Sequence, residues 1–342
     1  MTKRIGFACR WIDRLDQVNG IKSTDDAKQY NTGATTVAWL NRQTREVAEQ
    51  KLWDLMVQNI EAVRRLVERV GELDEHLRMV RVGSDILPVY THNDWSYFWR
   101  QPEVIRYCDD KLGTVGDTAR RLDVRLSFHP GQFTVLASDN PDIVQKSIEE
   151  FEYHVDMARF MGYGKKFQDL KINVHIAGRA GPEGIRRAYN RLSAEARNCI
   201  TIENEENSWG LDDCLTISDI IPIVLDVHHF WIREGEYINC ADERVKRIVD
   251  SWRGVRPTMH YSVSREDYLD ISKYPTRPEM AVLLEQGYRK QKLRAHSNFY
   301  WNEPVNEWAL SFLDTHDIMC ESKGKNLASF ALAEQAKELG LL

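Results

Sequence analysis

Short apolar runs alternate with longer amphipathic stretches along almost the whole chain. Eight of these runs are rich in aliphatic and β-branched residues, and they cover residues 4–9, 79–83, 124–129, 170–176, 199–204, 223–226, 257–262 and 317–321. Runs of this kind are typical of strands that are buried on both faces. Each is followed by a helical or loop stretch, and parallel strands need such crossovers, so the pattern predicts a parallel sheet.

The stretches between these runs keep the spacing of helices. In the first long one, the apolar positions with helical spacing are Leu52, Leu55, Met56, Ile60, Val63 and Leu66. Further helices are expected over residues 103–122, 141–161, 182–196, 211–219, 242–252, 304–314 and 326–339. Eight such units in 342 residues fit an α/β fold in which residues 1–342 form a single (β/α)8 TIM barrel domain, with an open doubly wound sheet as the alternative.

Three longer stretches interrupt this alternation. Residues 10–35, 84–101 and 263–303 follow the first, second and seventh predicted strands. The carboxyl ends of barrel strands carry the active site, so these stretches are expected to be functional loop insertions on that C-terminal face.

Composition indicates in which cellular compartment the protein works and which partners suit it. Every apolar run is too short for a membrane span, and the first residues lack the apolar segment of a signal peptide. The six cysteines have no CxxC spacing, which is typical of a reducing compartment. We therefore expect a cytoplasmic protein that is not secreted. The net charge of −6 argues mildly against a nucleic-acid partner, although bound cations would offset it.

Ionisable side chains stand at or just after the ends of six of the eight predicted strands: His129, His175, Glu203, Asp226, His229, His260 and Glu321. Any one of them alone would be read as a hydrogen-bonded structural residue. Brought together in a barrel opening, so many carboxylates and imidazoles would repel one another and stay underpaired. Divalent cations resolve both problems, so the set predicts a metal site.

The chemistry of these ligands is imidazole and carboxylate without cysteine, which suits Zn, Mn or Fe. The set exceeds one ion's coordination number, so two or three metals with bridging carboxylates are expected. Paired metals activate water in phosphoryl transfer, but metal-dependent sugar isomerases also use barrels. The ligand set alone leaves both reactions open.

Other polar residues have weaker signals. Gln132 and Phe133 follow His129 on a turn and are candidates for entering a DNA stack, or for simple turn packing. Lys323 and Lys325 flank a glycine, an arrangement that suits phosphate or a solvated loop. His92 is a candidate ligand, acid or loop residue. His228 adjoins His229, and only one of two neighbours on an extended segment can face the same site.

Six motifs together carry a family resemblance. They are Ser127-Phe128-His129-Pro130-Gly131-Gln132, Val174-His175, Ile202-Glu203-Asn204, Leu225-Asp226-Val227-His228-His229, Met259-His260-Tyr261-Ser262 and Glu321-Ser322-Lys323-Gly324-Lys325. Their order and spacing resemble the UV damage endonuclease family (UvdE) over nearly the whole chain. A more distant similarity is to endonuclease IV and other xylose-isomerase-like TIM barrels.

The resemblance implies a metal-dependent DNA repair endonuclease. Family members fold as a TIM barrel with up to three metals, usually manganese, with zinc or magnesium as alternatives here. They cut on the 5′ side of pyrimidine dimers, 6-4 photoproducts and abasic sites. The implied partner is damaged double-stranded DNA, met in the nucleoid, with no organic cofactor and no membrane, and we expect a monomer.

The resemblance also assigns roles to individual residues. One metal would be held by His129, His175 and Glu203, and a second by Glu203, Asp226, His260 and Glu321. His229 and His296 would help to hold a third. The resemblance places His92 near the scissile phosphate. We expect catalytic roles for Glu203, Asp226, His92 and Lys323. Gln132 and Phe133 would probe the lesion, with Lys325 on the DNA.

Three positions depart from the family pattern. Phe133 and Phe7 stand where tyrosine is familiar, so a hydroxyl is lost at each. Thr258 stands two residues before His260, where family members have a lysine that can be carboxylated, and threonine cannot take that modification.

Two other functions stay open. A sugar isomerase of the same barrel class predicts a closed pocket and activity on an aldose without DNA. A lesion-binding module predicts tight binding to damaged DNA without a nick.

Overall fold

Eight parallel strands form the centre of the molecule. The computed structural model describes residues 2–14, 24–269 and 274–342. The strands are β1 (Ile5–Cys9), β2 (Met79–Val82), β3 (Arg125–Phe128), β4 (Lys171–His175), β5 (Ile200–Glu203), β6 (Ile223–Val224), β7 (Thr258–Tyr261) and β8 (Asp317–Cys320). They pair in the order β6-β5-β4-β3-β2-β1-β8-β7, and all eight lie within their predicted ranges.

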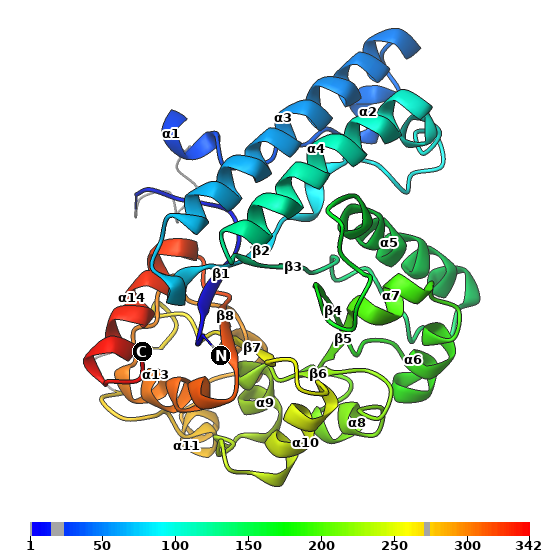
Figure 1. The fold of residues 1–342 in the computed structure, drawn as a ribbon. Coiled ribbons are helices and arrows are strands. Elements are labelled where there is room, and N and C mark those ends of the chain that lie inside the picture. Colours follow the sequence, from blue (N-terminus) through cyan, green and yellow to red (C-terminus); the bar gives the residue numbers. More distant parts are fainter. Residues whose placement is uncertain (1, 15–23, 270–273) are drawn as a thin grey trace.

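The two outer strands of this order, β6 and β7, meet just beyond the end of β6. A parallel bridge joins Asp226 to His260, and the amide of His260 donates to the carbonyl of Leu225 at 2.9 Å. This contact closes the sheet into a barrel, which excludes the open doubly wound sheet. Figure 1 shows β1 and β8 side by side near both termini, with the helices around the strands.

The helices cover the outside of the barrel. They are α1 (Asp25–Lys28), α2 (Val37–Leu40), α3 (Arg45–Gly71), α4 (Pro102–Arg121), α5 (Pro141–Phe160), α6 (Gly181–Tyr189), α7 (Ala194–Cys199), α8 (Leu211–Leu215), α9 (Val227–Glu234), α10 (Glu243–Ser251), α11 (Met280–Glu285), α12 (Lys290–Leu293), α13 (Glu303–Leu310) and α14 (Lys325–Glu338). The six apolar positions predicted for the first long helix are all buried on α3. The helix expected over 182–196 is two helices, α6 and α7.

The predicted insertions follow β1, β2 and β7. They contain α1, two short 3₁₀ turns (Ser84–Ile86 and Phe98–Arg100), and α11 and α12, whereas α2 follows the first insertion. Residues 15–23 and 270–273 of these insertions lie outside the described residues. Within the part of the chain that is described, no helix is long and apolar enough to cross a membrane.

Alternation along the strands divides the side chains between the helices and the barrel interior. Ala8, Met79 and Met319 pack together as a small cluster apart from the main core. Asp317 is fully buried at the amino end of β8, whereas Glu203 is fully buried at the carboxyl end of β5. The barrel therefore buries acidic groups at both ends.

Candidate metal centre

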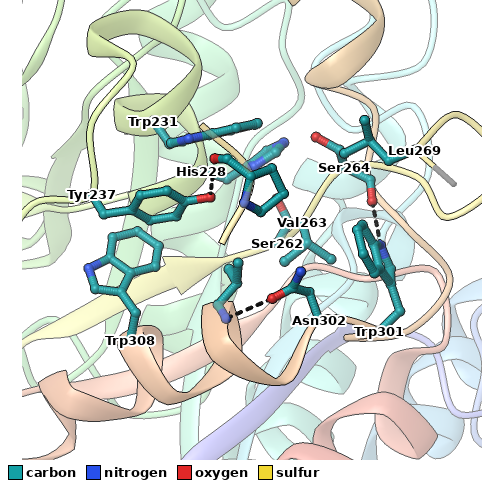
Figure 2. A pocket seen from close by; sticks show the side chains of 12 residues that line it. His228, Trp231, Tyr237, Ser262, Val263, Ser264, Leu269, Trp301, Asn302 and Trp308 are labelled. Carbon is teal, nitrogen blue, oxygen red and sulfur yellow. Dashed lines mark hydrogen bonds between the residues drawn. The ribbon is translucent and has the colours of Figure 1, made fainter. Parts of the chain in front are cut away.

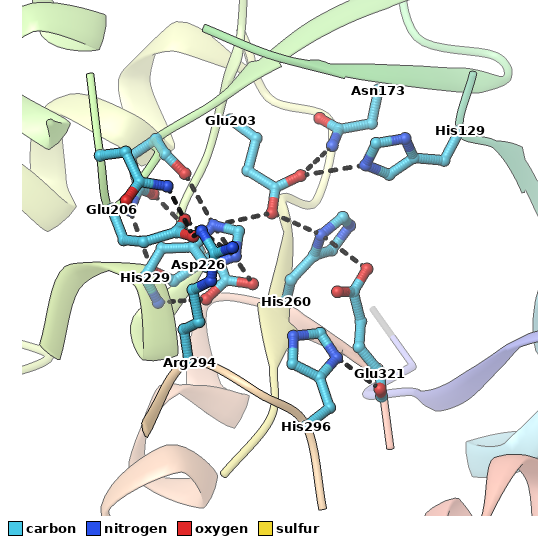
Figure 3. A network of polar contacts seen from close by, with 12 residues as sticks. His129, Asn173, Glu203, Glu206, Asp226, His229, His260, Arg294, His296 and Glu321 are labelled. Atoms are coloured by element: carbon cyan, nitrogen blue, oxygen red, sulfur yellow. Dashed lines mark hydrogen bonds and ion pairs between the residues drawn. The ribbon is translucent and has the colours of Figure 1, made fainter. Parts of the chain in front are cut away.

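The ionisable residues predicted at strand ends converge in the barrel opening. His175, Glu203 and His260 belong to β4, β5 and β7, while His129 and Glu321 directly follow β3 and β8. Figure 3 shows the carboxylate of Glu203 directed toward His129 and His260, and that of Glu321 directed toward the same nitrogen of His260. Parallel strands bring their carboxyl ends to one face, which is why residues far apart in the sequence meet here.

Three groups of side chains approach closely enough to share a cation. Within each group the candidate ligand atoms lie within 4.8 Å of one another; the groups are His129, His175 and Glu203; His129, His260 and Glu321; and Glu203, Asp226 and His260. Oε1 of Glu203 lies 3.0 Å from Nδ1 of His260, and Oε2 of Glu203 lies 3.3 Å from Nε2 of His129. Glu203 therefore stands between two of the candidate sites.

Several buried atoms of these residues have no hydrogen-bond partner among the described residues. They are Oε1 of Glu203, Oδ2 of Asp226, Nδ1 of His175 and Nδ1 of His260, of which Oε1 of Glu203 and Nδ1 of His260 have other candidate ligands as their close neighbours. An unsatisfied buried polar atom costs free energy, and four in one place need a shared partner. Oxygen and nitrogen donors without sulfur suit divalent cations. The residues fit a divalent-metal centre.

The pKa values of the two central carboxyl groups, Glu203 and Asp226, are shifted in opposite directions. Burial disfavours the charge of Glu203, but the imidazoles of His260 and His175 hold the pKa of this carboxyl well below its usual range. Burial raises the pKa of Asp226 well above its usual range, and the charges of Glu203 and Glu321 add to this against the opposing effect of His229. Protein groups alone therefore do not balance the charges here, whereas cations would.

The predicted third group is less compact. Nδ1 of His229 lies 3.0 Å from the carbonyl oxygen of Asn204, and its Nε2 lies 3.6 Å from Oε2 of Glu206. Nδ1 of His296 lies 2.9 Å from the carbonyl oxygen of Glu321. Neither histidine belongs to a close three-residue group of the kind above within the described chain.

The segment around His228 and His229 differs from the sequence expectation. β6 ends at Val224, and both histidines lie in the first turn of α9 rather than on an extended strand. Asp226 is the N-cap, and its Oδ1 accepts from the amide of His229 at 2.7 Å. Asp226, which was expected to end the strand, therefore lies beyond it and begins a helix.

Helical geometry separates the two neighbouring histidines. His229 faces Glu203, with 3.7 Å between Nδ1 and Oε1. His228 lines a separate pocket with Trp231, Tyr237 and other aromatic residues (Figure 2). Only one of the pair faces the candidate metal centre, as predicted, although the reason is helical rotation and not strand alternation.

The predicted DNA-contacting residues lie on the rim of the barrel. Phe133 is 86% exposed, Gln132 beside it is exposed, and His92 lines the same groove as Phe133. Lys323 is exposed, whereas Lys325 is partly buried and burial lowers its pKa. His92 therefore shares a groove with Phe133 and belongs to none of the three close groups of candidate ligands.

The sequence analysis missed several polar partners of these ligands. Arg81 on β2 pairs with Glu321, and Asn173 on β4 donates to Oε2 of Glu203. Asn204 accepts from the amide of Asp226 at 2.8 Å and donates to its carbonyl oxygen at 3.0 Å. The available signal was a polar residue at an inward-facing position of an otherwise apolar strand, as at Arg81 and Asn173.

Thr258 is buried on β7, and its hydroxyl has no hydrogen-bond partner among the described residues. A buried amine is nevertheless present in the barrel interior, on a different strand. Nζ of Lys171 on β4 lies 2.9 Å from Nε2 of His260.

Comparison with known proteins decides the family. The sequence profile of the family described as UV-endonuclease UvdE matches residues 4–340. The chain belongs to this family. UvdE proteins are DNA repair endonucleases, so the family and the enzyme class expected from the sequence are confirmed.

Individual UvdE relatives are distant in sequence but extensive in coverage. The UV DNA damage endonuclease of Clostridium perfringens is 26% identical over 321 residues, which are 90% of this chain and 70% of that protein. The UV-damage endonuclease of Schizosaccharomyces pombe is 26% identical over 97% of this chain but only 50% of its own length. The crystal structure of SacUVDE superposes with a TM-score of 0.73 at 21% identity, covering 99% of this chain and 100% of that one, which supports the TIM barrel fold.

Proposed function

We propose that this UvdE protein nicks duplex DNA on the 5′ side of UV photoproducts, both cyclobutane dimers and 6-4 photoproducts, and at abasic sites. The observation that carries the proposal is the close grouping of buried carboxylate and imidazole atoms around Glu203, whose candidate ligand atoms lie within 4.8 Å of one another. Membership in an endonuclease family favours this reaction over sugar isomerisation.

The proposed centre holds two or three divalent cations, with manganese preferred over zinc or magnesium. His129, His175 and Glu203 would hold one, and Glu203, Asp226, His260 and Glu321 would hold a second. His229 and His296 would help to hold a third. Such cations lower the pKa of a water molecule and stabilise negative charge on phosphate oxygens.

Protein groups around this centre would orient the ligands and the DNA. Arg81 pairs with Glu321 and Asn173 donates to Glu203, so both carboxylates are held in place before DNA binds. Lys323 on the rim is proposed to neutralise phosphate charge, and His92 to contact the scissile phosphate from the groove.

The lesion itself would be read at the rim. A damaged base pair costs less to unstack than an intact one, so extrusion favours damaged sites. Gln132 and the exposed ring of Phe133 are proposed to fill the space that the lesion leaves. Lys325 is proposed to contact the DNA beside them.

A plasmid assay tests this function. The purified protein with Mn²⁺ should convert UV-irradiated supercoiled plasmid to the nicked form, and should leave undamaged plasmid intact. Chelation of the metal should abolish nicking. If Mn²⁺, Zn²⁺ and Mg²⁺ all fail to support incision, the proposal is contradicted. Tight binding to the irradiated plasmid without a nick would instead support a lesion-binding module.

A further inference from the structure

Lys171 lies in an unusual place for a lysine. Its side chain comes from the first residue of β4, and the residue is only 3% exposed. No carboxylate lies within ion-pairing distance of its amino group in the described parts of the chain. Burying an ammonium group without a carboxylate is costly, so this residue does not act as an ordinary structural ion-pair partner.

The one hydrogen-bond contact of the Lys171 amino group among the described residues is His260. The distance from Nζ to Nε2 is 2.9 Å, and His260 is fully buried. The opposite ring nitrogen, Nδ1, lies 3.0 Å from Oε1 of Glu203 and 3.2 Å from Oε1 of Glu321. The imidazole therefore lies between an amine on one side and two carboxylates on the other, and Figure 3 shows the carboxylate side.

This arrangement distinguishes the two ring orientations of His260. Rotating the ring by half a turn would place carbon atoms where the two nitrogens now lie. The amine would then lose its partner, and the side toward Glu203 would lose its nitrogen. Lys171 thus favours the orientation in which Nδ1 points at the carboxylates. As a neutral amine, its Nζ accepts from Nε2–H of the ring, which leaves the lone pair of Nδ1 for a cation.

We propose that Lys171 is a positioning residue for His260, and through it for the cation site that His260 shares with Glu203 and Asp226. Lys171 does not itself touch the cation. The inference rests on the proposed metal centre and adds a residue from the opposite side of the barrel to it. Partners that orient metal-binding histidines contribute about 10- to 100-fold to metal affinity or activity.

The test uses Lys171→Met, which keeps the length of the side chain and removes the amine. The affinity for Mn²⁺ would be measured by titration calorimetry and by the electron spin resonance of free Mn²⁺. We expect the affinity to fall by about 10- to 100-fold. The metal-free variant should melt at the wild-type temperature or above it, because a buried amine without a carboxylate is removed.

Two further variants complete the test. Lys171→Gln keeps a polar group that can bond Nε2, and should recover part of the lost affinity. Lys166→Met removes an exposed lysine and should bind Mn²⁺ as wild type does. A merely structural role would instead lower the melting temperature of metal-free Lys171→Met, and that result would overturn the proposal.

The failures of the two proposals are distinguishable. If wild type binds Mn²⁺ and Lys171→Met binds it equally well, only the role of Lys171 is wrong. If wild-type protein binds no divalent metal at all, the metal centre itself is wrong.

Discussion

At the amino end of the barrel, Asp317 is fully buried and every oxygen has a donor. Its Oδ2 accepts from Arg125 at 2.5 Å, and its Oδ1 accepts from Arg256 at 2.6 Å and from the amide of Arg4 at 2.9 Å. At the carboxyl end, Glu203 is equally buried, yet no guanidinium or ammonium pairs with it among the described residues, and its Oε1 faces Nδ1 of His260 at 3.0 Å and Nδ1 of His229 at 3.7 Å. The same barrel therefore buries Asp317 with two guanidinium partners and buries Glu203 without any.

The difference separates structure from chemistry. A buried carboxylate with two guanidinium partners is complete, and it can only hold strands together. A buried carboxylate whose close neighbours are imidazoles has no full positive charge beside it, and it keeps its own charge available for a cation. Substitutions at the two ends should accordingly have opposite effects on stability and on incision.

The largest effect on activity is expected for Glu203→Gln. Glutamine keeps the size of the side chain but removes the charge that two candidate cation sites share, and such charge is worth several kcal/mol in the transition state. Incision of UV-irradiated plasmid should fall by roughly 10³-fold. Circular dichroism should show a folded protein, and near-normal nicking by the variant would contradict the role of Glu203.

The matched substitution at the other end is Asp317→Asn. It leaves Arg125 and Arg256 without their shared carboxylate, and breaking a buried pair in this way costs about 3–5 kcal/mol. Urea unfolding should show this loss, while the incision rate per folded molecule stays close to wild type.

Asp314→Asn is the control for that substitution. Asp314 is largely exposed and pairs only with Lys3 among the described side chains, so its loss should change the free energy of unfolding far less than that of Asp317. Equal destabilisation by both substitutions would remove the contrast between the two ends of the barrel.

Asp226 lies at the carboxyl end of the barrel, and its substitution should affect metal binding without affecting the stability of the metal-free protein. Burial and the neighbouring charges of Glu203 and Glu321 raise its pKa well above the usual range, so the charge of this side chain is disfavoured in the metal-free protein. Asn is close in shape to a protonated Asp. Metal-free Asp226→Asn should therefore unfold at about the wild-type urea concentration.

Added metal should separate Asp226→Asn from wild type. Mn²⁺ at about 100 times its dissociation constant should stabilise the wild-type protein by about 2.7 kcal/mol, and Asp226→Asn by much less. Asp317→Asn should retain the full increment from its lower starting stability. An equal increment for all three proteins would mean that Asp226 does not bind metal.

Much of this contrast was visible in the sequence. Strands buried on both faces leave continuous apolar runs, so all eight strands were predicted, and their ends placed His129, Glu203 and Glu321 on one face. The helix α9 was missed because Val227–Glu234 begins with apolar and aromatic residues that continue the run of β6. Periodicity cannot separate a strand from a buried helix over so few residues.

The partners across the barrel interior were beyond sequence reasoning. Lys171 meets His260, and Arg81 meets Glu321, because strands that do not pair with each other point these side chains into the same barrel interior. Such contacts depend on barrel closure and on strand register, which local patterns do not contain. The same limit applies to Arg125 and Asp317, which are 192 positions apart.

The smallest effect is expected for Phe133 on the rim, which belongs to neither of the two groups of buried carboxylates compared above. Phe133 is 86% exposed, so Phe133→Ala should leave the free energy of unfolding unchanged. A stacked aromatic is worth at least about 1 kcal/mol per base, and affinity for a photoproduct duplex should therefore fall roughly fivefold. Phe133→Tyr should restore the affinity, and undamaged duplex should bind all three proteins equally. Equal losses on damaged and undamaged DNA would instead make Phe133 a general contact, so that lesion selection would have to come from elsewhere on the rim.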